Sequence, residues 1–259
     1  MILLPLLVAS ASTTAPAADQ ARFKTCVELV DTDPQAALDS AEKWRIEGGN
    51  VLARQCQGLA YAAQARWLSA MTTFQQAAEA AQQAKDSRAA TLWVQAANSA
   101  LAGGEFVKAR SFIDAALIEG TLKGPEAGEA HLDRARALVA VGDLTKARSD
   151  LDAAAKLVPQ DPLIWLLSAS LARRTGDLDR ARTDIAEAAR LSPDDASVAL
   201  EAGNIAAMMG NDAAARTAWE AAVKIAPEGP QGKAAAKALE QFGGPTLSSP
   251  ADPSPPRLP

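Results

Sequence analysis

Apolar side chains in the second half of the chain recur every three or four residues, and glycine and proline interrupt them at regular intervals. Between Gly176 and Pro193, the residues Ala181, Ile185 and Ala188 follow this spacing, which places them on one face of a helix. Glycine commonly ends the preceding helix, and proline cannot continue a helix. The pattern therefore predicts a turn, a short amphipathic helix and a stop.

The same pattern occurs three times in one register. The positions that repeat with a spacing of 34 residues are Gly142, Gly176 and Gly210; Pro159, Pro193 and Pro227; Ala147, Ala181 and Ala215; and Ala154, Ala188 and Ala222. Four series in one register indicate an internal repeat made of helix–turn–helix hairpins. One hairpin buries too little apolar surface to fold alone, so stacked hairpins are expected to share a core.

This repeat resembles the tetratricopeptide repeat. Trp165 lies where that family usually has its tryptophan, and Gly203 lies where two helices of a unit approach closely. Gly58 and Trp93 fit the family pattern more loosely in the first half of the chain. The resemblance implies an all-α protein, bacterial in type, folded as a right-handed superhelical solenoid of antiparallel helix pairs. The hairpins are expected near residues 19–48, 51–84, 90–120, 128–159, 162–193 and 196–227, with a C-terminal capping helix at 232–242.

Two terminal segments stand outside this predicted repeat domain at 19–242. Residues 1–18 resemble a secretory signal peptide, because an apolar run at Ile2–Ala9 precedes small residues, although no Lys or Arg comes before the run. The run is too short to span a bilayer. Residues 243–259 predict a disordered, Pro-rich tail. We expect a periplasmic or secreted protein; the alternative is a cytoplasmic one.

The chain has two cysteines, Cys26 and Cys56, each in a predicted helix. Their separation is close to one repeat, so stacked hairpins can bring them together. In an oxidising compartment such a pair is most simply a disulfide. Two inert buried thiols are the alternative.

Charge and motifs favour a non-catalytic protein. The formal net charge of −5 disfavours a nucleic-acid partner. His131 is the only histidine, and no phosphate-binding, nucleophile-elbow or zinc-protease motif occurs. We therefore expect no enzyme activity, no metal and no cofactor. A recurring Ala-Arg pair gives Arg110, Arg148, Arg182 and Arg216, which we interpret as surface ion pairs with carboxylates three or four residues away, such as Arg110 with Asp114.

The resemblance also indicates where a partner would bind. In the family the first helix of each hairpin lines the concave face, and the equivalent positions here include Val94, Asn98, Leu132, Arg136, Leu166, Arg173, Leu200 and Asn204. Leucines beside arginine and asparagine suit a peptide with an acidic or C-terminal carboxylate group. The implied function is a protein-interaction scaffold in the bacterial envelope. The alternative is a periplasmic assembly factor or chaperone for secreted or outer-membrane clients.

Overall fold

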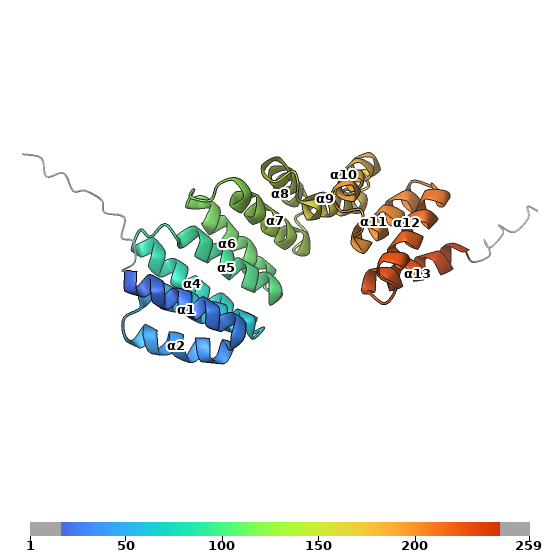
Figure 1. Cartoon of the computed structure of the whole chain (residues 1–259). Coiled ribbons are helices and arrows are strands. Elements are labelled where there is room, and N and C mark those ends of the chain that lie inside the picture. Colours follow the sequence, from blue (N-terminus) through green and yellow to red (C-terminus); the bar gives the residue numbers. More distant parts are fainter. Residues whose placement is uncertain (1–16, 244–259) are drawn as a thin grey trace, which may run out of the picture. The chain divides into compact units, whose positions relative to one another are not determined.

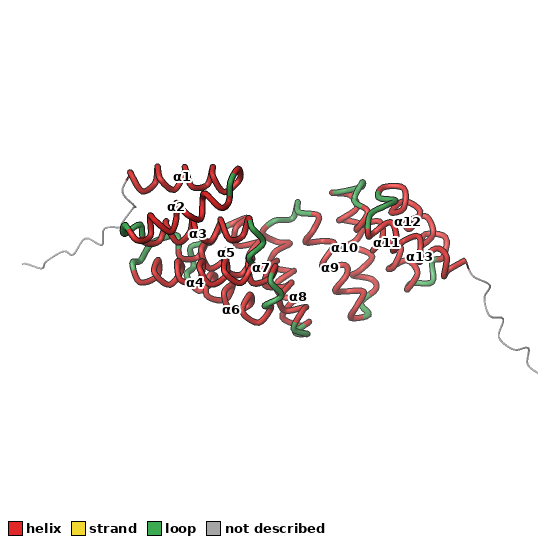
Figure 2. The backbone as a smooth tube through the Cα atoms, turned by 90° about the horizontal axis from the view of Figure 1, so that it is seen from below, coloured by secondary structure: helices red, strands yellow, loops and turns green. Residues whose placement is uncertain are grey.

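The computed structural model describes residues 17–243 of the chain, and this part is all-α (Figure 1). Its described residues form helices and connecting loops, with no strand among them (Figure 2). The helices divide between two compact units, Met1–Pro159 and Gln160–Pro259. The helices of each unit are given separately.

Unit 1 contains four helix hairpins. Its helices are α1 (Ala17–Thr32), α2 (Pro34–Ile46), α3 (Asn50–Ala63), α4 (Trp67–Gln83), α5 (Ala89–Ala102), α6 (Phe106–Ile118), α7 (Gly124–Ala140) and α8 (Leu144–Leu157). Each helix packs against the next one in the chain. The fourth hairpin begins at Gly124, somewhat before the expected residue 128.

Unit 2 contains two hairpins and a final helix. Its helices are α9 (Pro162–Thr175), α10 (Leu178–Leu191), α11 (Ala196–Met208), α12 (Asp212–Ile225) and α13 (Pro230–Gly243). The last helix packs against both α12 and α11, so it covers the end of the final hairpin. The predicted capping helix is therefore present.

The turns inside the hairpins use the residues that the repeat supplies. Gly176 has φ +82°, a left-handed conformation that glycine adopts without a steric penalty. Asp177 then caps α10, because its carboxylate accepts a hydrogen bond from the Arg180 N–H at 3.2 Å. Gly142 and Asp143 do the same before α8. The turn between α3 and α4 departs from this rule, because Ala65 has φ +54° at the equivalent place.

Glycine and alanine let the helices of a hairpin approach closely. A Cβ atom on Gly203 of α11 would lie 2.4 Å from the Trp219 indole of α12. In unit 1, a Cβ atom on Gly58 would lie 2.6 Å from the Phe74 ring. Real atoms cannot approach so closely, so a side chain at either glycine would push the two helices apart.

The core of each unit combines these small residues with a few large ones. In α10, Ala181 and Ala188 have no exposed surface, and Ile185 between them is 6% exposed. The apolar face predicted from the sequence is therefore the buried face. In unit 1, Phe74, Leu92 and Ile113 fill the spaces among buried alanines. Each of these large side chains stabilises the fold by about 1.5–3 kcal/mol through burial.

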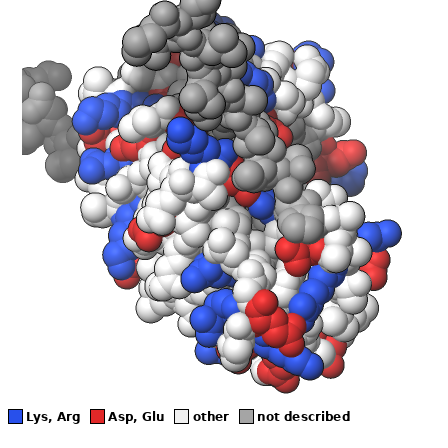
Figure 3. Space-filling model, turned by 90° about the vertical axis from the view of Figure 1, so that its left-hand side faces the viewer, with Lys and Arg blue, Asp and Glu red and all other residues white. Residues whose placement is uncertain are grey.

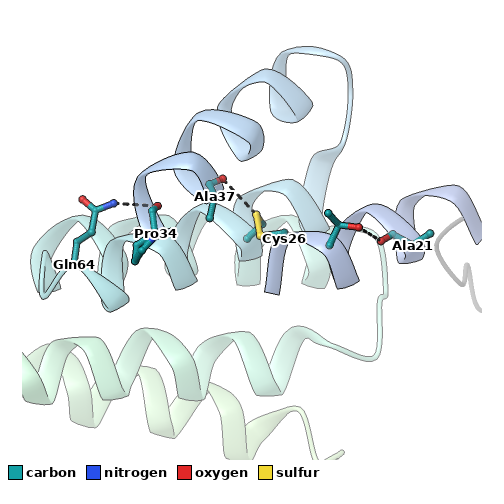
Figure 4. Close-up of a disulfide and its surroundings, with 7 residues drawn as sticks. Ala21, Cys26, Pro34, Ala37 and Gln64 are labelled. Carbon is teal, nitrogen blue, oxygen red and sulfur yellow. Dashed lines mark hydrogen bonds between the residues drawn. A yellow bond between two sulfur atoms is a disulfide. The ribbon is translucent and has the colours of Figure 1, made fainter. Parts of the chain in front are cut away.

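The two cysteines form a disulfide between α1 and α3, which confirms the predicted pairing (Figure 4). The Cα atoms of Cys26 and Cys56 are 6.0 Å apart. Cys26 is the one residue of α1 that is fully buried. The close-up also shows Gln64 donating a hydrogen bond to the Pro34 carbonyl, which joins α2 to the turn after α3.

The predicted terminal segments lie almost entirely outside the described residues. Of the expected signal peptide, residues 17 and 18 are described, and they begin α1. Of the expected tail, Gly243 is described as the last residue of α13. Among residues 17–243, no helix combines the length and the apolar character that crossing a bilayer requires.

Candidate protein-interaction surface

The predicted binding residues fall in both units, and unit 1 places them in different environments. Asn98 on α5 is exposed, and Val94 on the same helix is half-buried against the core. Leu132 on α7 is only 5% exposed. A leucine so deeply buried offers almost no surface to a ligand. Leu132 is therefore a core residue and is not part of the candidate surface.

Arg136, the remaining candidate in unit 1, forms an ion pair with a carboxylate of its own helix. Its guanidinium lies 3.0 Å from the Asp133 carboxylate one turn earlier. Asp133 is largely buried, and this burial raises its pKa, although the charge and hydrogen bond of Arg136 oppose the rise. Arg136 therefore compensates a buried acid, which sequence reasoning did not anticipate.

In unit 2, α9 and α11 pack together and carry the other four candidates. Their spacing along each helix puts Leu166 and Arg173 on one side of α9, and Leu200 and Asn204 on one side of α11. Leu166 and Leu200 are half-buried and keep part of their surface accessible. The ion pair between Arg173 of α9 and Glu201 of α11 shows that these two sides adjoin.

Arg173 is held by a carboxylate on the neighbouring helix. Its guanidinium donates to both oxygens of Glu201, at 2.7 and 3.2 Å. Glu201 is 8% exposed, so the pair is largely withdrawn from solvent. Such a two-point pair fixes the side chain and neutralises its charge. Arg173 is thus committed within unit 2, and it is not the free cation that recognition of an acidic peptide would need.

Asn204 is also engaged within unit 2. Its amide oxygen accepts a hydrogen bond from the indole N–H of Trp219 at 3.1 Å, and its amide nitrogen lies 3.4 Å from Glu201. A chain of contacts therefore runs from α9 through α11 to α12. These contacts fix the orientation of the polar side chains of this surface. Its two leucines remain partly accessible to solvent.

Two apolar side chains that the prediction did not include extend this surface. Leu163, one turn before Leu166 on α9, is 42% exposed. Met208, one turn after Asn204 on α11, is 52% exposed, and its sulfur lies 4.0 Å from the Arg173 guanidinium. We call the set Leu163, Leu166, Arg173, Leu200, Asn204 and Met208 the first-helix face of unit 2.

A second polar network in unit 1 involves the only histidine. His131 Nδ1 lies 2.8 Å from the Asp150 carboxylate, and Arg134 donates to both oxygens of Asp150, at 2.7 and 2.8 Å. Burial alone would raise the pKa of Asp150, but these hydrogen bonds and charges lower it below its ordinary value. His131 therefore helps to hold a buried carboxylate.

The repeat itself contained a signal for these buried acids. Asp150 and Asp184 are one period apart, and so are their partners Arg134 and Ser168. Glu201 likewise stands two periods after Asp133. Reading the polar residues in the repeat register, as was done for Gly, Ala and Pro, would have found these positions.

The row of arginines on the second helices follows the predicted ion pairs only in part. Arg148 lies 3.7 Å from Asp152, and Arg182 lies 3.9 Å from Asp179. Asp114 pairs instead with Arg134 of α7, at 2.8 Å, so the expected pair with Arg110 is wrong. Arg110 is one turn from Asp114 on the same helix, but α7 brings the Arg134 guanidinium between α6 and α8. Asp114 therefore pairs with Arg134 and not with Arg110.

Arg216 also departs from the expected pairing. It donates to the Phe242 carbonyl at 3.2 Å and lies over the Phe242 ring, where a pair with Glu220 was predicted. On the face shown in Figure 3, Lys and Arg are interspersed with Asp and Glu. Over the described residues, no group of three or more His, Cys, Asp or Glu side chains is arranged to hold a metal ion.

Comparison with known families gives one match. The tetratricopeptide-repeat profile matches residues 94–162, 132–196 and 166–230, which together span more than half of the chain. None of the curated proteins compared with the chain matches it.

Several solved structures share the fold. PilW, described as a widely conserved type IV pilus biogenesis factor, has a TM-score of 0.71 at 18% identity, covering 85% of this chain and 98% of PilW. PilF of Pseudomonas aeruginosa has a TM-score of 0.70 at 14% identity, covering 86% of this chain and 97% of PilF. YrrB, described as having an unusual peptide-binding site, has a TM-score of 0.59 at 20% identity, covering 77% and 96%. At these identities the likeness is one of fold.

Proposed function

The chain belongs to the tetratricopeptide-repeat family, and from this premise we propose that it is a non-catalytic scaffold that binds a partner protein through the first-helix face of unit 2. The family's repeats generally serve protein interaction. The observation that carries the proposal is the exposure of Leu163 and Met208 beside the half-buried Leu166 and Leu200. Apolar side chains left partly open on two adjoining helices suit the apolar side of a partner segment.

The geometry changes the kind of partner that we propose. An acidic peptide was expected from Arg136 and Arg173, but both arginines already neutralise carboxylates of this chain. Affinity at this face should therefore come mainly from apolar contact. The Arg173–Glu201 pair and Asn204 would then supply orientation.

The proposal is tested at the two most exposed apolar positions. A photo-crosslinking residue placed at Leu163 or at Met208 should capture the partner, and one placed at Ile225 should not. Ile225 is a matched control, because it is an exposed apolar residue on a second helix, α12. Changing both Leu163 and Met208 to glutamate should weaken binding by at least about tenfold, while Ile225→Glu leaves it unchanged.

The outcome that would contradict this surface is equal capture from Ile225, or binding unaffected by the double substitution. The pair Arg136→Glu and Arg173→Glu is a poorer test. Each of these changes would place a second negative charge beside a buried carboxylate and so destabilise the fold itself. Loss of binding in that variant would not separate contact from folding.

An assembly factor is the second candidate. The likeness in fold to PilW and PilF supports it, since PilW is a pilus biogenesis factor. The same crosslinking experiment distinguishes the two functions. One stoichiometric partner supports a scaffold, whereas many client proteins captured at Leu163 support an assembly factor or chaperone.

We further propose that the protein works in the cell envelope, outside the cytoplasm. The Cys26–Cys56 disulfide supports this location, because disulfides persist mainly in oxidising compartments. The predicted signal peptide points the same way. Cell fractionation with N-terminal sequencing of the mature chain tests the proposal. Recovery in the cytoplasm, with two reactive thiols in the denatured and unreduced protein, would contradict it.

A further inference from the structure

Unit 1 contains a cleft that is lined mainly by charged side chains. Its volume is about 420 Å³. The residues that line it are Arg110, Asp114, Arg134, Leu138, Lys146, Ser149 and Asp150. They come from α6, α7 and α8, and α7 packs against both other helices (Figure 1). We call this the α6–α8 cleft.

The carboxylates of the cleft are already satisfied. Arg134 of α7 donates hydrogen bonds to Asp114 at 2.8 Å and to both carboxylate oxygens of Asp150. His131 contacts Asp150 as well. At the rim, Lys146 lies 2.9 Å from Asp143. These contacts leave one cation of the cleft to be accounted for.

That cation is Arg110. Its Nε–H group is buried and has no hydrogen-bond partner in the described part of the chain. Asp114, one turn further along α6, is paired with Arg134 instead. The pKa of Asp143 is lowered first by its hydrogen bonds from Lys146 and also, to a smaller extent, by the charge of Arg110. Asp143 is paired with Lys146, so the Arg110 guanidinium forms no ion pair with a carboxylate in the described part of the chain.

A buried donor without a partner is rare in folded proteins and calls for an explanation. Here the arginine that carries this donor lines an open cleft together with other charged side chains. A guanidinium presents two parallel N–H groups, which match the two oxygens of one carboxylate. Asp114 and Asp150 in the same cleft disfavour a doubly charged group such as phosphate, since their charges would repel it. The cleft thus has the chemistry to accept a single carboxylate.

We propose that the α6–α8 cleft is a binding site for an acidic peptide segment, in which Arg110 binds one glutamate or aspartate carboxylate. Lys146 and the Ser149 hydroxyl line the same cleft and can contact the neighbouring peptide backbone. This site is formed by α6, α7 and α8 of unit 1, so it goes beyond the apolar surface of unit 2 and does not depend on it. A scaffold with both sites could hold two different segments.

The proposal is tested by NMR on the full chain labelled with nitrogen-15. The Arg110 Nε–Hε signal is assigned by its disappearance in Arg110→Lys. The probes are the capped peptides acetyl-Ala-Glu-Ala-amide, its glutamine counterpart and its phosphoserine counterpart. We expect the glutamate peptide to shift the Arg110 signal saturably, and the glutamine peptide to bind about tenfold more weakly or less.

Two variants complete the test. Arg110→Gln should abolish the saturable shifts around the cleft, and an unchanged thermal unfolding midpoint would establish that this variant is folded. Arg182→Gln is the matched control, because Arg182 holds the equivalent repeat position but is 67% exposed and paired with Asp179; it should bind like the parent protein.

Three results would overturn the proposal: equal shifts with the glutamate and glutamine peptides, tighter binding of the phosphoserine peptide, or binding that survives in Arg110→Gln.

Discussion

Replacing both Cys26 and Cys56 with serine should release α1 from unit 1 while the rest of the unit stays folded. Cys26 is the one residue of α1 that is fully buried, and Phe23 and Val30 are only partly buried against the same cluster. An isolated helix of this length is marginal in water. The Arg22–Glu47 pair beside the cluster is well exposed on both sides and adds little.

The size of the effect follows from the loop that the disulfide closes. The two cysteines are 30 residues apart in sequence, and the loop-entropy relation for this length gives about 3–4 kcal/mol. Because repeat proteins are stabilised mainly by contacts between neighbours, this loss should be concentrated in α1 and α2. Unfolding of α1 alone should then become about 150- to 900-fold more frequent.

Hydrogen exchange measured by mass spectrometry can resolve this local change. Peptides covering 17–32 should exchange far faster in the double serine variant, and in the reduced parent protein, than in the oxidised parent. Peptides from α5 serve as the internal control and should change little. Equal exchange of α1 in all three samples would show that packing holds the helix, and would refute the reasoning.

Three further predictions concern single positions. Ala65→Gly should stabilise the protein by about 0.5–1 kcal/mol in urea denaturation, because Ala65 occupies a left-handed conformation at φ +54°; a lower midpoint would contradict this. Gly203→Ala should destabilise it by about 1–3 kcal/mol, since the new methyl group would overlap Trp219, and an unchanged thermal midpoint would argue against the close packing. Asp133→Asn should raise stability at neutral pH. Burial raises the pKa of Asp133 in the folded protein, so the folded state loses stability as pH rises through that value. The gain from the asparagine should therefore shrink as pH falls through that raised value and should be lost below 3.8, the ordinary value; a gain independent of pH would contradict the assignment.

Most of the fold could be predicted from the sequence because its signals are local. The Gly176–Asp177 turn, the small and large residues of α10 and the stop at Pro193 all act within one hairpin. The 34-residue register then repeated these signals, which made the order of the hairpins predictable as well. The disulfide followed from the same register, because neighbouring hairpins place equivalent helices side by side.

The charged residues could not be assigned in this way. Spacing along one helix predicted a pair between Arg110 and Asp114, yet Asp114 pairs with Arg134. The family resemblance presented Arg173 as a ligand for a partner, yet Glu201 holds it at two points. A long flexible side chain can reach several carboxylates, and the choice among them depends on distances between helices that no single-helix pattern contains.

The amino-acid sequence thus specifies the hairpins, their turns and their buried faces, since backbone conformation and helical periodicity are local properties. The packing of neighbouring helices chooses the partner of each charged group. It buries Leu132 and neutralises Arg173, and it leaves Leu163 and Met208 open on one face and Arg110 without a carboxylate on another. The proposed binding sites are those surfaces where packing leaves an apolar side chain or a charge unsatisfied, and only the folded chain reveals them.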